Sequence, residues 1–123
     1  MKIQKILMLL ALVFIMTGAN VNNGVQLNST WYSTKTFNGR KTADGTVVRH
    51  SGQRIVALSP DMFKKGFKLG DRIHVVSKSD PKVNGYWTVR DKTAPRLRGH
   101  IDFLLHPSEG KGFHNGKVTV TKI

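Results

Sequence analysis

The pattern of hydrophobic and polar positions predicts a chain made mainly of short strands. In residues 86–90, Trp87 and Val89 alternate with polar or amphipathic neighbours, which is the period-two pattern of a half-buried strand. Residues 117–122 alternate in the same way, with Val118 and Val120 set against two threonines. Similar short runs predict further strands at residues 30–33, 46–49, 54–58, 72–77 and 103–105.

Turn signals separate these strands and leave little room for helix. Dipeptides such as Asn38-Gly39 are typical of turns. Ser59 followed by Pro60 predicts the cap and first position of a single helical turn that continues over residues 62–65. Six or seven short strands with almost no helix favour a small closed barrel, because closure removes the exposed edges of a sheet.

The N-terminal segment, residues 1–19, has the pattern of a secretory signal peptide. Lys2 and Lys5 give it a positive start, and an unbroken apolar run follows at residues 6–16. Small residues end the segment, so cleavage is predicted after Ala19. The apolar run is shorter than the roughly 20 residues that cross a bilayer. An uncleaved signal, the alternative, would leave the protein anchored to the membrane.

The remaining chain reads as one small domain. Residues 20–29 are rich in asparagine and lack periodicity, which predicts a linker. Residues 30–123 then form the domain. The chain contains no cysteine, so no disulfide can stabilise this domain and thiol chemistry is excluded.

The charge balance is strongly basic. The chain carries 20 lysines and arginines against 7 acidic residues, a net charge of +13. Without Lys2 and Lys5 of the signal, the charge is +11. Such an excess favours an anionic partner. For an exported protein, an acidic membrane face or an anionic wall polymer fits better than nucleic acid. The alternative is that the charge mainly serves solubility.

Two aspartates, Asp91 and Asp102, lie next to runs of residues that are expected to pack in the core. Asp91 follows the strand predicted at residues 86–90, and Asp102 comes directly before the apolar run at residues 103–105. A basic, proline-containing loop at residues 92–99 connects them. A carboxylate at the edge of a core is expected to be hydrogen-bonded, perturbed in pKa, or both. These two side chains are the first candidates for a functional site.

Short blocks spread along the chain carry a family resemblance. In order they are Thr30-Trp31-Tyr32, Thr42-Ala43-Asp44-Gly45, Ile55 to Pro60, Lys68 to Ile73, Val89-Arg90-Asp91 and Gly99 to Asp102. Together they resemble the three-aspartate (3D) domain of the double-psi β-barrel superfamily, which includes rare lipoprotein A, expansins and the catalytic barrel of membrane-bound lytic transglycosylase A. The most specific part is the pair of aspartates eleven positions apart, the second within a His-x-Asp sequence.

The resemblance implies a six-stranded double-psi barrel that acts on the bacterial cell wall. In that family the second aspartate of the pair, here Asp102, is tied to glycan-strand chemistry, and Asp91 matches the first. One departure is Ser59, which stands where the family has its earliest aspartate. Asp61 lies two residues further on.

Other positions that match the family are candidates for substrate binding. Tyr32 and Thr42 match positions that line the family's groove, although a core aromatic or a turn cap would explain either residue. His100 also matches, and its alternation with Ile101 suggests that it faces the same side as Asp102. We expect Trp87 to line the groove as well.

Cleavage of a glycosidic bond needs a proton for the leaving oxygen and stabilisation of an oxocarbenium-like centre. A lytic transglycosylase can manage with one carboxylate, because a hydroxyl of the muramic acid itself attacks and no water has to be activated. This role needs a carboxyl pKa raised towards neutrality. Burial of Asp102 and a nearby ionised Asp91 would raise it, whereas the neighbouring arginines at positions 90, 96 and 98 would oppose the shift.

We therefore predict an exported lytic transglycosylase with Asp102 as general acid/base. Asp91 either orients Asp102 or holds the loop at residues 92–99. The alternative is an expansin-like wall-binding protein that loosens or docks on glycan without cutting it, and Ser59 favours this alternative. A third possibility is a basic adhesion module.

Other chemistries lack the residues they need. The five histidines are scattered, without the close spacing of a zinc site, and the acidic residues lack the calcium-loop pattern. No glycine-rich phosphate loop and no serine elbow is present. We expect no metal and no cofactor.

The expected partner is peptidoglycan glycan strands or another anionic polymer of the cell envelope, and not nucleic acid. Membrane contact is expected only through an uncleaved signal. We expect a monomer located in the periplasm, the outer membrane or the cell envelope, or secreted.

Overall fold

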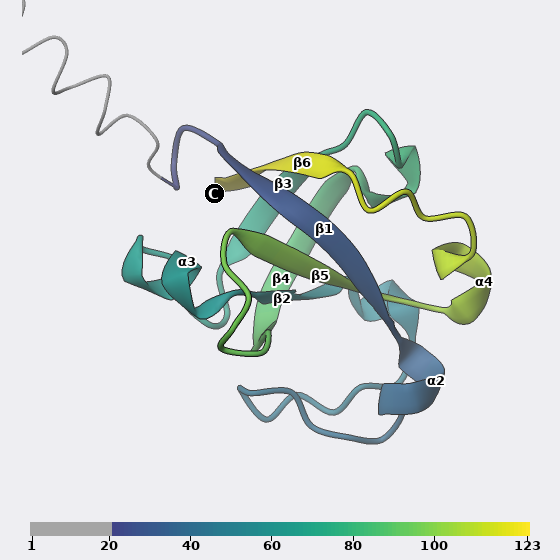
Figure 1. Ribbon diagram of the computed structural model, residues 1–123. Coiled ribbons are helices and arrows are strands. Elements are labelled where there is room, and N and C mark those ends of the chain that lie inside the picture. The colour runs from purple at the N-terminus through teal and green to yellow at the C-terminus, as the bar shows by residue number, and fades with distance from the viewer. Residues whose placement is uncertain (1–20) are drawn as a thin grey trace, which may run out of the picture.

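The computed structural model describes residues 21–123, and in this range six strands close into a barrel accompanied by three short helices (Figure 1). The order of the strands around the barrel is β1-β5-β2-β4-β3-β6. The predicted six-stranded, mainly β barrel is confirmed. The predicted signal peptide lies outside the described residues. The strands are β1 (Val25–Ser33), β2 (Ile55–Leu58), β3 (Arg72–Val76), β4 (Gly85–Lys92), β5 (His100–Leu105) and β6 (Lys117–Lys122).

Two parallel pairs join strands that are far apart in the sequence. β1 pairs with β5, and β2 pairs with β4, both in parallel. The other neighbours, β1 with β6, β2 with β5, β3 with β4 and β3 with β6, are antiparallel. Parallel neighbours need a crossing connection rather than a tight turn. This topology places β2 between β4 and β5, the strands that carry Asp91 and Asp102.

The helices are single turns that follow strands or turns. They are α2 (Thr34–Phe37), α3 (Pro60–Lys64) and α4 (Pro107–Gly110), and two 3₁₀ turns lie at Ser51–Gln53 and Pro81–Val83. α3 is the helical turn predicted after Ser59, but the Ser59 side chain makes no capping hydrogen bond to it. Because β1 and β5 are parallel, α2 and α4 follow them at the same end of the barrel (Figure 1).

Two element predictions are wrong. The segment predicted as a linker, residues 20–29, contains the first half of β1. Val25 and Leu27 are buried there and pair across to β6, and the asparagines on either side of them concealed this alternation. Residues 46–49 form no strand, because only an isolated bridge joins Lys41 to Val47. This segment is instead a loop that lies over the barrel.

A second, smaller hydrophobic cluster packs outside the barrel. The interior holds the large core, in which Trp87 and Phe103 meet with ring centroids 4.9 Å apart. On the outer face, Val48 of the loop at residues 38–50 covers Ile55 and Leu104. Burial of such side chains contributes about 1.5–3 kcal/mol each. The cluster therefore holds the loop against β2 and β5, next to the two aspartates.

Across residues 21–123, no helix has the length and apolar character needed to span a membrane.

Candidate functional site

Strand register brings the two aspartates into one row on the outer face of the barrel. Thr30 of β1 lies opposite Asp102 of β5, Asp102 opposite Ala57 of β2, and Ala57 opposite Asp91 of β4. Neighbouring strands lie about 4.8 Å apart, so the Cα atoms of the two aspartates are roughly 10 Å apart. In this register Ala57, with its small methyl side chain, is the residue between them. We call these four residues the carboxylate row.

Asp102 is a carboxyl group that stays protonated unusually far towards neutral pH. Burial raises its pKa from the ordinary value of 3.8 to about 6. The Thr30 hydroxyl, which donates to Asp102 Oδ1 over 2.9 Å, lowers the pKa, and the charge of Asp91 raises it. A carboxyl with this pKa can both release and accept a proton near pH 6.

His100 completes a chain of hydrogen bonds that ends on Asp102. Its Nε2 lies 2.6 Å from Thr30 Oγ1. Because the single Thr30 hydroxyl proton points to Asp102, Thr30 Oγ1 accepts from His100 Nε2–H. Burial lowers the pKa of His100, which favours the neutral ring that this arrangement uses. His100 and Asp102 thus face the same side of β5, as the alternation suggested.

Asp91 holds the covering loop in place. Its Oδ1 accepts hydrogen bonds from the backbone amides of Ala43 (3.0 Å) and Lys92 (2.9 Å). Its charge also acts on Asp102. Asp91 therefore contacts the loop at residues 38–50, and it also contacts Lys92, the first residue of the loop that it was predicted to hold. It acts on Asp102 through its charge alone, so a role in orienting Asp102 stays a prediction.

Thr42 serves the same loop rather than an open groove. It is 6% exposed, and its hydroxyl donates to Asp44 Oδ1 over 2.7 Å. Asp44 also accepts from the amide and hydroxyl of Thr46 and pairs with Arg90 at 3.1 Å. Burial raises the pKa of Asp44, but the hydrogen bonds from Thr46, Thr42 and Arg90 outweigh burial and hold it low. Arg90 is therefore committed to the loop.

Tyr32 places a buried phenol beside the carboxylate row. Its hydroxyl is buried and has no hydrogen-bond partner within residues 21–123. Burial, followed by the charges of Asp91 and Asp102, holds the pKa of this phenol well above its ordinary value. The ring packs edge-on against Phe37, with centroids 5.6 Å apart. A buried hydroxyl without a partner is costly, and the hydrogen-bonding capacity of the Tyr32 phenol is unused among residues 21–123.

Trp87, which we expected to line the groove, does not lie beside the carboxylate row. Trp87 is 1% exposed and lies in the barrel core against Phe103. Its indole N–H donates to the carbonyl oxygen of Val83 over 2.8 Å. The alternation of Trp87 with Val89 already placed both on the apolar face of β4, so the sequence held the signal for this outcome.

Ser59 and Asp61 are positioning residues whose roles the sequence did not reveal. Ser59 Oγ accepts from the His100 amide over 2.9 Å, and Asp61 accepts from the Gly99 amide over 3.0 Å. Burial raises the pKa of Asp61, but hydrogen bonds from Ser59 and Gly99 and the charge of Arg98 hold it below its ordinary value. The two side chains together fix the start of β5, and hence Asp102.

Thr30 was also not singled out from the sequence, although it is the residue that touches both His100 and Asp102. Its alternation with Tyr32 on one strand places both side chains on the face that carries the row. That spacing was the available signal.

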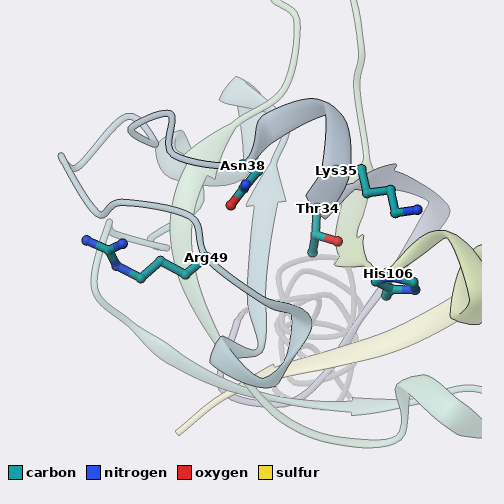
Figure 2. Close-up of a pocket in the computed structure, with 5 residues that line it drawn as sticks. All are labelled: Thr34, Lys35, Asn38, Arg49 and His106. Atoms are coloured by element: carbon teal, nitrogen blue, oxygen red, sulfur yellow. The ribbon is translucent and has the colours of Figure 1, made fainter.

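A hollow of about 210 Å³ lies beyond the outer cluster, where β1 and β5 end. Figure 2 shows that the charged ends of Lys35 and Arg49 extend from it in different directions. Its lining residues are Thr34, Lys35, Asn38, Arg49 and His106. In the described part of the chain, no three histidine or acidic side chains are grouped to hold a metal ion.

Comparison with solved structures identifies the barrel. The structure is similar to the crystal structure of apo-expansin from Clavibacter michiganensis, with a TM-score of 0.56 and 18% sequence identity. The fold is a double-psi β-barrel. The match covers 81% of this chain and 50% of the expansin, so this chain corresponds to about half the length of that protein. No protein-family model matches the sequence, and no curated protein matches it.

Proposed function

We propose that this protein binds a cell-wall glycan across the outer face of its double-psi barrel, as an expansin-like wall-binding or wall-loosening module. The observation that carries the proposal is the carboxylate row on a barrel similar to that of an expansin. Tyr32 adds an unpartnered hydroxyl, and His100 and Asp102 add polar groups on one face. These groups suit the hydroxyls of a polysaccharide.

Peptidoglycan, or another anionic envelope polymer, is the proposed ligand. The net charge of +11 beyond the predicted signal favours a negatively charged polymer. We propose that residues 1–19 direct export, that the barrel acts as a monomer, and that it works in the cell envelope or outside the cell.

Cleavage of the glycan is a second candidate function, and the carboxyl of Asp102 favours it. Its pKa of about 6 leaves much of it protonated in mildly acidic to neutral surroundings. Because Oδ1 accepts the Thr30 hydrogen bond, Oδ2 is the oxygen free to carry the acid proton towards a ligand. Such a group meets the requirement for a single general acid and base.

In a transglycosylase reaction, the Asp102 proton would pass to the glycosidic oxygen as its bond to the sugar C1 breaks. A hydroxyl of the same muramic acid would then bond to C1 and return its proton to the Asp102 carboxylate. The phenol of Tyr32 would donate a hydrogen bond to the sugar, since its raised pKa keeps it protonated. Asp91 would raise the proton affinity of Asp102 through its charge.

A digest of purified peptidoglycan separates the two functions. The protein, Asp102→Asn and the control Asp71→Asn would be incubated with the polymer, and products and sedimented protein would be measured. Asp71 bonds to Lys122 and the Lys68 amide, away from the row. Sedimentation of all three proteins without released product is expected for the binding module.

Release of anhydro-muropeptides by the protein and Asp71→Asn, but not by Asp102→Asn, would instead establish the transglycosylase. Products with reducing ends would demand a second carboxylate, and Asp91→Asn would be tested next. Failure of the protein to sediment with the wall, together with no product, would overturn both functions.

A further inference from the structure

An exposed aromatic ring stands on the β3–β4 face of the barrel. Tyr86 is 53% exposed, although it lies within a regular strand. The His74 ring, directly across from it on β3, lies with its centroid 5.2 Å from that of Tyr86, and the Arg72 guanidinium carbon lies 5.2 Å from the Tyr86 centroid. These three residues form what we call the Tyr86 ledge.

A hollow of about 280 Å³ adjoins the Tyr86 ledge. Its base is rigid, because the Arg54 guanidinium stacks 3.7 Å from the Trp87 ring centroid and donates to the carbonyl oxygens of Asn84 (2.9 Å) and Tyr86 (3.2 Å). A preformed site avoids the cost of ordering side chains when a ligand binds. The lining residues are Gly52, Gln53, Arg54, Arg72, Tyr86, Trp87 and Thr88.

The lining offers hydrogen-bond donors that the protein leaves free, and none of the lining residues is acidic. Within residues 21–123, neither the Arg72 guanidinium nor the Thr88 hydroxyl hydrogen-bonds to another side chain or carbonyl, and Arg72 contacts only the Tyr86 ring through its charge. An aromatic face beside free donors suits a ligand with one apolar face and a polar rim.

We propose that the Tyr86 ledge and its hollow form a subsite for one sugar residue of a glycan strand. The inference rests on the proposed function in taking a wall glycan as the ligand. A pyranose ring presents C–H groups to an aromatic face and hydroxyls at its edge, which Arg72 and Thr88 can meet.

The position of the ledge suits a polymer rather than a single sugar. Thr88 and Asp91 are three residues apart on β4, which corresponds to about 10 Å along an extended strand. Tyr86 is farther still from the carboxylate row. One sugar ring cannot reach both places, whereas a glycan strand can, and two linked contacts strengthen each other through effective concentration.

The test measures binding of N-acetylglucosamine oligomers by calorimetry, with Asp102→Asn as the background so that no cleavage can intervene. In this background, Tyr86→Ala is expected to weaken binding about five- to tenfold, the loss of one aromatic stacking contact. Tyr86→Trp should retain binding. The matched control is Val76→Ala, which also trims an exposed apolar side chain of the β3–β4 region (47% exposed) and should leave affinity unchanged.

Equal affinity of Tyr86→Ala and Val76→Ala for the oligomers would overturn the proposal. So would weaker binding of Tyr86→Ala to a single-stranded oligonucleotide with unchanged sugar binding, because bases also stack on such a ring. Either result leaves the proposed function standing if the protein still sediments with peptidoglycan. Conversely, the oligomer binding measured by calorimetry would still be interpretable if the digest released no product and the protein did not sediment with peptidoglycan.

Discussion

Thr30 has one hydroxyl proton and two polar neighbours, and the direction in which it donates sets the state of the carboxylate row. Its proton goes to Asp102 Oδ1, and its oxygen is left to accept from His100. A hydrogen bond to a carboxylate favours the charged form, so Thr30 acts against the burial that keeps Asp102 neutral.

Replacing Thr30 by valine should therefore raise the pKa of Asp102 above its present value of about 6. Valine keeps the shape of threonine but cannot donate a hydrogen bond. Titration of the Asp102 carboxyl by carbon-detected NMR measures the change, and Thr30→Ser, which keeps the hydroxyl, is the control. A pKa that falls in Thr30→Val would contradict the arrangement.

Asp102→Asn should stabilise the protein at pH 7.5 and have little effect at pH 4. The folded-state pKa of Asp102 is raised from 3.8 to about 6, so the folded protein holds a proton that the unfolded chain releases. The contribution of this proton to the free energy of unfolding is fully present below about pH 4 and is lost as the pH rises through 6. Asparagine is neutral at both pH values, and the gain at pH 7.5 is up to about 3 kcal/mol.

Thermal unfolding of the protein and of Asp102→Asn at the two pH values measures this difference. Asp71→Asn, away from the row, should show no such gain. If Asp102→Asn changed the stability equally at pH 4 and pH 7.5, the pKa of Asp102 would not be raised by folding, and the prediction would be contradicted.

The sequence predicts the candidate site residues only as far as a motif names them. Asp91 and Asp102 were found from their spacing and surroundings, and the structure brings them into one row. Thr30 escaped notice, and Ser59 and Asp61 were noted without their roles, because all three act through contacts between distant segments that only the fold defines. Chain order alone does not reveal which residues face each other across parallel strands.

At the scale of elements, the loop at residues 38–50 covers the outer face of the barrel and borders the row. It has almost no regular structure of its own, so side chains hold it. Asp44 anchors it from within, Asp91 fixes it to β4, and Val48 seals it against the outer cluster. The position of this loop beside the carboxylate row thus depends on a few hydrogen bonds to the carboxylates of Asp44 and Asp91.

Asp44→Ala should loosen this loop more than it destabilises the barrel. The substitution removes the acceptor for Thr42, Thr46 and Arg90, and each charged hydrogen bond contributes about 1.5–3 kcal/mol before solvent exposure reduces it. We expect faster hydrogen exchange at the Thr46 amide, with little change in the amides of β3. Uniform acceleration across both regions would show that the loop and barrel unfold together.

The predicted boundaries of the strands were wrong where polar residues mask the alternation of buried side chains. β3, β4 and β6 were predicted from their alternation, because each has one face in the core. The first half of β1 was mistaken for a linker, since only Val25 and Leu27 mark its buried side. The strand predicted at residues 46–49 failed for the opposite reason, because Val48 packs on the outside of the barrel and Val47 forms only an isolated bridge, so neither extends the sheet.

At the scale of the whole molecule, the acidic side chains are occupied and many basic ones are free. Among residues 21–123, the acidic residues in ion pairs are Asp44 and Asp71. Others, such as Asp61, Asp80 and Glu109, accept hydrogen bonds from backbone amides. An anionic polymer therefore meets lysines and arginines that few carboxylates neutralise.

Retention on the wall should fall steeply as salt increases. Screening shortens the reach of surface charge from about 10 Å at 0.1 M to about 3 Å at 1 M salt. We expect sedimentation with peptidoglycan to weaken strongly over this range for the protein and Asp102→Asn alike. Binding that does not change with salt would show that uncharged contacts recognise the wall and would contradict this prediction. Complete loss of binding at 1 M salt would indicate that charge alone holds the protein, as in a basic adhesion module.

The pairing of β1 with β5 and β6 ties the first part of the barrel to the last. A ribosome or a translocation channel delivers a chain in sequence order, so β1 has no partner until the final quarter of the chain has emerged. Contacts between such distant segments also slow folding, because a long loop must close first. β2, β3 and β4 can pair with one another earlier, but the barrel closes only when β5 and β6 reach β1. Until then the chain has no closed barrel, and a chain without one is easier to pass along a narrow channel than the finished fold.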